Sequence, residues 1–121
     1  MAAPPLSEVL DEARRLGLLG PGPVSDHIAH AEGFLAEPVP HRFLDLGSGA
    51  GVPGLVLAVA WPEASAVLLD GSVRRAAFLR RAVVALALED RVEVVGARAE
   101  AAGRETRWRQ GFDRVVARAF G

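Results

Sequence analysis

The sequence contains neither cysteine nor lysine, and it has no run of about 18 uncharged apolar residues of the kind that spans a membrane. The absence of cysteine excludes disulfide bonds, thiolate zinc sites and catalysis by a cysteine nucleophile. The N-terminal stretch carries acidic residues and no apolar core, so we expect neither a membrane span nor a signal peptide. We therefore expect a cytoplasmic protein.

The chain has 121 residues, half of them hydrophobic, and a net charge of -1, which fits one globular domain. Its charge is uneven. Residues 1–60 hold 3 arginines against 7 acidic residues, and residues 61–121 hold 11 against 8. The second half is thus mildly basic, which neither requires nor excludes an RNA partner.

Two proline-rich breaks, at residues 20–23 and 37–40, separate an N-terminal segment from the rest. Within it, Ser7 and Ser25 are placed to cap two short helices that end near Leu16 and Leu35. We predict that residues 1–40 form a helical segment packed on a core formed by residues 41–121.

From residue 42 onward, short apolar runs alternate with helical stretches, which is typical of βαβ units and a parallel sheet. The expected strands are 42–46, 65–69, 91–95 and 113–117. Pro53 suits the first turn of a helix that ends near residue 60, Ser72 caps a long helix, and a weaker helix falls between 99 and 110. The predicted fold is α/β, with a Rossmann-like sheet of about four parallel strands.

The most informative stretch is the first strand, which runs directly into a glycine-rich turn at Gly47, Gly49 and Gly51. Such glycines allow the backbone to approach a ligand closely, and the start of the next helix offers unpaired N–H groups. Asp70 ends the second strand, where a carboxylate can accept both hydroxyl protons of a ribose. The turn and the acid together predict nucleoside binding.

Two classes of cofactor use this arrangement. The glycines of residues 49–54 fit the G-x-G-x-x-G spelling of dinucleotide enzymes, whereas Asp45 completes D-x-G-x-G-x-G, the pattern of S-adenosylmethionine-dependent methyltransferases. A carboxylate there suits a ligand with ammonium and sulfonium groups, but would repel a pyrophosphate by roughly 1 kcal/mol or more. We favour the methyl donor. An NAD-type ligand and a purely structural turn are the alternatives.

With these motifs in view, the chain resembles the bacterial small-subunit ribosomal RNA guanine-N7 methyltransferases known as RsmG or GidB. The segments that carry the likeness are FLDLGSGAGVPGLVLAVAWPEASAVLLD, RRAAFLRRAVVALAL, VVGARAEAAG and FDRVVARAFG, in that order. The likeness covers residues 43–121, and Asp26 stands where a looser family segment has arginine.

The resemblance implies a set of site residues for S-adenosylmethionine. The glycines would hold its methionine part with Asp45 nearby, Asp70 would hold the ribose, and the turn at Ala99 and Glu100 would contact the adenine. Arg118 would lie at the reaction face, as the one candidate catalytic residue, and hold either the donor carboxylate or the RNA. The cofactor-binding set is Asp45, Gly47, Ser48, Gly49, Gly51, Asp70, Ala99, Glu100 and Arg118, with no metal ligand.

The implied reaction is methyl transfer to guanine N7 in small-subunit ribosomal RNA, free or in the 30S particle. Guanine N7 has a free lone pair and no proton to lose, so neither a general base nor a protein nucleophile is needed. The absence of cysteine excludes attack on pyrimidine carbon through a thiolate, and residues 116–120 lack the [DN]-P-P-[YFW] motif of enzymes that methylate exocyclic amino groups.

The family normally continues for several strands beyond the Arg-Ala-Phe motif. In the usual strand order 3-2-1-4-5-7-6, the fourth strand of this chain would be an open edge. We expect a fragment, a truncated product, or one half of a homo-oligomer that covers this edge. Two alternatives therefore remain: a donor-binding module without catalysis, and a fragment of an NAD-type oxidoreductase.

Three further groups of residues have both a structural and a functional interpretation. His27 and His30 could ligate a metal, but packing or surface roles are favoured because no third ligand is evident. The arginines at 74, 75, 80 and 81 could bind RNA phosphates, although a solvated helix face is the favoured interpretation. Trp61 and Trp108 could stack on bases, but structural roles are favoured for both.

Overall fold

The computed structural model describes residues 5–98 and 111–117. Its centre is a four-stranded sheet in the order β3-β2-β1-β4, in which all neighbouring strands are parallel. The strands are β1 (Arg42–Leu46), β2 (Ser65–Asp70), β3 (Val92–Gly96) and β4 (Arg114–Ala117). The predicted α/β class and the first four places of the expected strand order are confirmed.

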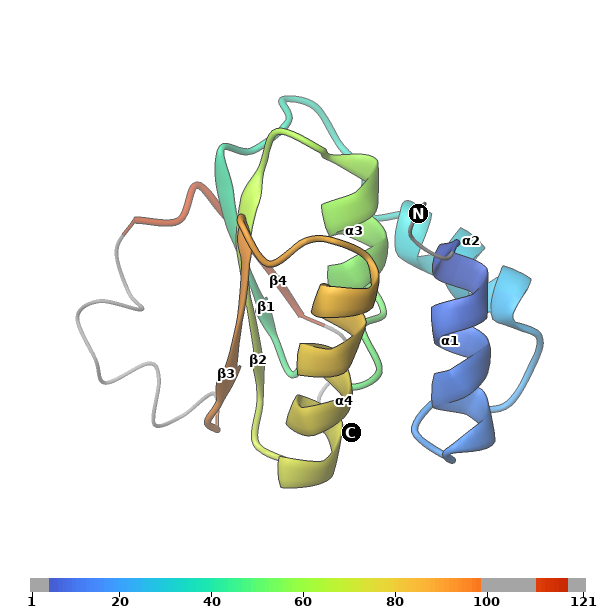
Figure 1. Cartoon of the computed structure of the whole chain (residues 1–121). Helices are drawn as coiled ribbons and strands as arrows, with labels where there is room; N and C mark the ends of the chain where they lie inside the picture. Colours follow the sequence, from blue (N-terminus) through green and yellow to red (C-terminus); the bar gives the residue numbers. More distant parts are fainter. Residues whose placement is uncertain (1–4, 99–110, 118–121) are drawn as a thin grey trace.

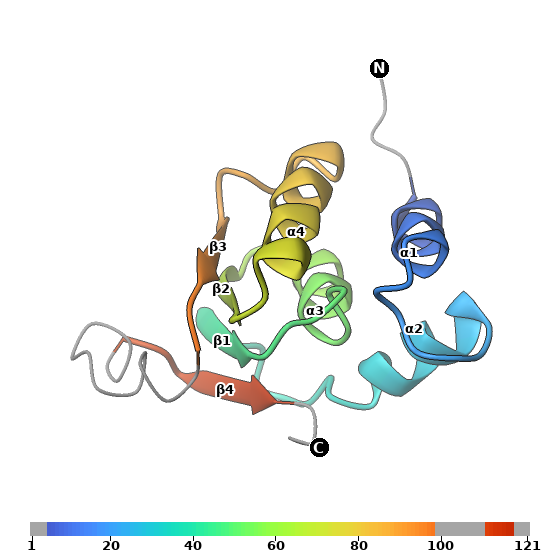
Figure 2. The same ribbon diagram turned by 90° about the horizontal axis from the view of Figure 1, so that it is seen from below.

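Helices cover one face of this sheet in two layers. The inner layer is α3 (Gly54–Ala60) and α4 (Val73–Ala85), and the outer layer is α1 (Leu6–Arg15) and α2 (Val24–Glu32) (Figures 1 and 2). The outer helices pack against the inner ones, α1 against α4 and α2 against α3. The division of the chain at residue 40 stays a prediction.

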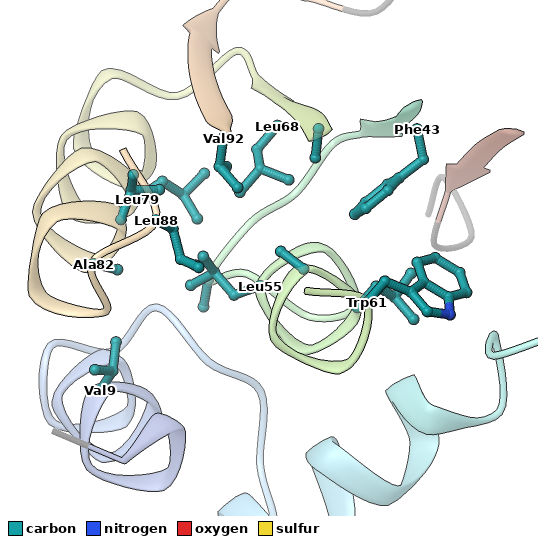
Figure 3. Close-up of a cluster of buried hydrophobic side chains, with 14 of the residues drawn as sticks. Val9, Phe43, Leu55, Trp61, Leu68, Leu79, Ala82, Leu88 and Val92 are labelled. Atoms are coloured by element: carbon teal, nitrogen blue, oxygen red, sulfur yellow. The ribbon is translucent and has the colours of Figure 1, made fainter. Parts of the chain in front are cut away.

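The main core lies between the sheet and the inner helices. Phe43 and Leu68 point from the sheet toward Leu55 of α3 and Leu79 of α4, and all four are fully buried (Figure 3). Phe43 also meets Trp61 edge to face, with ring centroids 5.4 Å apart. The structural interpretation of Trp61 is thereby supported, whereas Trp108 lies outside the described residues.

Side-chain hydrogen bonds stabilise the end of α3 and the start of β1. Arg91 donates to the carbonyl oxygens of Ala58, Trp61 and Ala64, which stabilises the end of α3 and the turn into β2. The carboxylate of Asp113 accepts hydrogen bonds of 2.8 Å from two backbone N–H groups at the start of β1. These two bonds lower the pKa of Asp113.

The helix starts differ from the sequence predictions. α1 follows Pro5 and α2 follows Pro23, and neither has a side-chain cap, so Ser7 and Ser25 are not capping residues. Each proline instead begins the helix with its carbonyl oxygen, which accepts hydrogen bonds from the N–H groups three and four residues later. The prediction for α4 is confirmed, because the hydroxyl of Ser72 accepts a hydrogen bond of 3.2 Å from the backbone N–H of Arg75.

Other boundaries moved by a few residues. α2 ends at Glu32 rather than near Leu35, and α3 begins at Gly54, with Pro53 as the residue before it. The weaker helix expected between 99 and 110 lies outside the described residues. Within residues 5–98 and 111–117, no helix is long and apolar enough to cross a membrane.

Candidate functional site

The glycine turn connects β1 to α3 at the carboxyl edge of the sheet. Gly47, Gly49 and Gly51 adopt φ values of +73°, +58° and +93°, a region that residues with a Cβ rarely enter. Gly51 has a second constraint, because a Cβ there would lie only 2.5 Å from Cγ of Leu55. The alternating glycines are therefore required by the path of the backbone, with or without a ligand.

Asp45 contacts this turn through a buried side chain. Its side chain has no exposed surface, and Oδ2 accepts a hydrogen bond of 2.9 Å from the hydroxyl of Ser48. Gly54, the first residue of α3, packs directly against the same carboxylate. The structure therefore places Asp45 between the sheet and α3, where it positions the turn.

Asp70 lies at the end of β2 and connects three parts of the chain. The N–H of Gly49 donates to Oδ2 at 2.7 Å, while Oδ1 accepts from the N–H of Ser72 at 2.8 Å and from Nε of Arg75 at 3.1 Å. Its side chain is 3% exposed, and that of Arg75 is 45% exposed. A buried carboxylate is thus held beside the glycine turn, with an arginine on its solvent side.

A cavity of about 250 Å³ opens at this point. It brings together four predicted site residues, namely Gly47, Ser48, Gly49 and Asp70, while Asp45 and Gly51 do not line it. Ala99, Glu100 and Arg118 lie outside the described residues. The cavity is also lined by Leu18, Leu19, Ala50, Val52 and Arg75, of which sequence reasoning proposed none as a donor contact.

Leu18 and Leu19 belong to the connection between α1 and α2, which side chains of both α4 and α2 contact. The guanidinium of Arg74 donates to the carbonyl oxygen of Leu16. His27 Nε2 lies 3.0 Å from the carbonyl oxygens of both Gly20 and Pro21. His27 therefore has a structural role, in agreement with the favoured interpretation. Within the described residues, no group of three His, Cys, Asp or Glu side chains is arranged to hold a metal.

The four arginines of α4 have different surroundings. Arg74 contacts the connection after α1, and Arg75 contacts Asp70. Arg80 lies beside the end of β3, and Arg81 lines a groove between α1 and α4. All four are exposed, in line with the favoured interpretation as a solvated helix face, and an RNA contact stays a prediction.

The groove between α1 and α4 is the larger cavity, at about 490 Å³. Side chains of both helices line it, among them Val9 and Phe78, and charged groups rim it. It contains no residue of the glycine turn and no strand residue. The smaller cavity is the candidate site, because it combines the glycine turn with a buried carboxylate.

Comparison with known proteins identifies the family. The family model described as "GidB: rRNA small subunit methyltransferase G" matches residues 24–121. The chain belongs to this family. A ribosomal RNA small subunit methyltransferase G from Prochlorococcus marinus is 38% identical over 97 residues, which cover 80% of this chain and 37% of the relative. Another, from Roseiflexus castenholzii, is 48% identical over 80 residues, covering 66% and 34%. The chain thus spans about a third of the length of these relatives.

Solved structures agree with this assignment at the level of the fold. A Klebsiella pneumoniae protein assigned as an O-methyltransferase superposes with a TM-score of 0.71 at 17% identity, covering 93% of this chain and 51% of the other. An O-methyltransferase from Bacillus cereus, crystallised with S-adenosylhomocysteine, gives 0.68 at 21% identity, covering 93% and 52%. The sheet and its helices thus have the fold of these methyltransferases.

Proposed function

We propose that this chain binds S-adenosylmethionine and forms the donor-binding part of an enzyme that methylates guanine N7 in small-subunit ribosomal RNA. The observation that carries the proposal is the cavity in which the glycine turn meets the buried carboxylate of Asp70, in a chain of the GidB family. That arrangement sets a turn that a ligand can approach closely beside the acceptor that a ribose requires.

The residues present fit this cofactor. The turn offers backbone close enough for a ligand because its glycines have no side chains, and Asp70 faces the same cavity. Leu18 and Leu19 add an apolar wall suited to the methylene chain of the donor. Asp45 would act through the turn. Contacts of Ala99 and Glu100 with the adenine, and of Arg118 with the donor or the RNA, stay predictions.

Binding and positioning are the contributions expected of this chain. The donor, when bound, supplies an electrophilic methyl group on its sulfonium. The turn and Asp70 would fix the donor at two points, so that an acceptor lone pair can approach in line. Guanine N7 needs no deprotonation, so the site requires no general base.

The RNA acceptor and the assembly follow as parts of the same proposal. We infer that the acceptor is small-subunit ribosomal RNA, free or in the 30S particle. Within the described residues, β4 pairs with β1 alone, and Val115 of β4 is 54% exposed. A second copy of the chain that covers this edge would bury it, and analytical ultracentrifugation would detect such a dimer.

Two measurements test the function. Transfer of a labelled methyl group to small subunits that lack the modification should require this chain and should be lost in Asp70→Asn. Titration calorimetry with S-adenosylhomocysteine, beside NAD, should show saturable binding of the first ligand alone. Binding without transfer would identify a donor-binding module, which is the second candidate. Binding of NAD alone would refute the proposal.

A further inference from the structure

The carboxylate of Asp70 has more hydrogen-bond donors than a ribose-binding acid needs. A carboxylate offers about four acceptor positions, two on each oxygen. Both positions on Oδ1 are filled, by the N–H of Ser72 and by Nε of Arg75, and one on Oδ2 is filled by the N–H of Gly49. Within the part of the chain that the structure describes, one position on Oδ2 is left for a ligand.

A ribose has two neighbouring hydroxyl groups, and it binds a carboxylate best when each hydroxyl donates to a different oxygen. One of the three donors must then leave. The two N–H groups are fixed, because one belongs to the glycine turn and the other to the residue that caps α4. Only Arg75 reaches Asp70 through a flexible side chain, and this side chain is 45% exposed. Arg75 is thus the donor that can move away.

We propose that Arg75 determines how strongly this site distinguishes a ribose from a 2′-deoxyribose: its guanidinium occupies the oxygen that the second hydroxyl requires. This inference rests on the proposed donor site. A ligand with both hydroxyls must displace Arg75, whereas a ligand with one hydroxyl uses the open position on Oδ2. The contact between Arg75 and Asp70 therefore opposes the diol alone. It is not needed to orient the carboxylate, since the two N–H groups already hold one oxygen each.

The test compares two ligands in two variants by titration calorimetry on the full chain. The ligands are S-adenosylhomocysteine and its 2′-deoxy analogue. In Arg75→Ala we expect about two- to fivefold tighter binding of the first, which corresponds to the loss of a half-exposed ion pair, and no change for the second. Arg81→Ala is the matched control, because it removes the same charge from α4 at a residue that lines the α1–α4 groove and not this cavity. We expect it to change neither affinity.

Salt provides an independent measurement. Since salt screens exposed ion pairs, the gap between wild type and Arg75→Ala for S-adenosylhomocysteine should shrink as ionic strength rises. Equal effects of Arg75→Ala on both ligands, or weaker binding of either, would overturn the proposal and make Arg75 a general support of the site. Failure of the wild type to bind S-adenosylhomocysteine would instead refute the donor site itself, and the inference with it.

Discussion

A methyl group added at Gly54 should destabilise the fold by disturbing the support of the glycine turn. A Cβ at this position would lie 2.7 Å from Cδ2 of Leu68 and closer still to the carboxylate of Asp45. Both side chains are fully buried, so neither can move into solvent. Overpacking of a core costs about 1–3 kcal/mol. Because the displaced carboxylate also loses alignment with the hydroxyl of Ser48, we expect Gly54→Ala to cost about 3 kcal/mol, at the upper end.

Urea unfolding followed by circular dichroism measures this loss, and the melting temperature should fall by roughly 10 °C. Gly20→Ala is the matched control, because a Cβ there would meet only Cε1 of His27 at an ordinary 3.7 Å. It should stay within about 0.5 kcal/mol of the wild type. Equal stability of Gly54→Ala and the wild type would refute the close packing of α3 against Asp45.

Three further substitutions test other parts of the structure. Ser48→Ala removes a buried hydrogen bond to Asp45 and should lower the free energy of unfolding by about 1–3 kcal/mol in urea titrations. Arg91→Lys cannot reproduce three hydrogen bonds to carbonyl oxygens and should lower the free energy of unfolding by about 1–3 kcal/mol in the same assay. Unchanged stability would show that these bonds do not stabilise the end of α3. Asp113→Ala should destabilise the protein at pH 7. Hydrogen bonding lowers the pKa of Asp113 in the folded state, so the stability that its carboxylate contributes is fully present above the unfolded pKa of about 4. This contribution is lost as the pH falls through the folded pKa. The acid unfolding curves of wild type and variant should therefore converge.

Strands were predictable from the sequence because their signal is local. β1 matches its predicted bounds, and β2 extends one residue further to include Asp70. Helix starts were less predictable, because the preference for a serine cap competes with the preference for proline before the first turn. At α1 and α2 the proline prevailed, whereas Ser72, with no proline beside it, caps α4 as expected.

The candidate cavity was only partly predictable, because some of its lining comes from distant parts of the chain. The glycine turn and Asp70 follow each other in one βαβ unit, so their spacing alone brings them together. Leu18 and Leu19 reach the cavity through a hydrogen bond that joins α4 to a carbonyl oxygen 58 residues earlier. No spacing rule connects such positions. The sequence therefore predicted the glycine turn and Asp70 but not the apolar lining by Leu18 and Leu19.

The two acids of the motif have different positions for a reason that strand geometry explains. Side chains alternate between the two faces of a strand. Phe43 belongs to the core between the sheet and the helices, so Asp45, two residues later, points to the same face and lies under α3. Asp70 is the last residue of its strand, so its carboxylate extends past the sheet edge to the cavity. Leu68 belongs to the same core, so alternation places Asp70 on this face too, and only its place at the end of β2 separates it from Asp45 and leaves it facing the cavity.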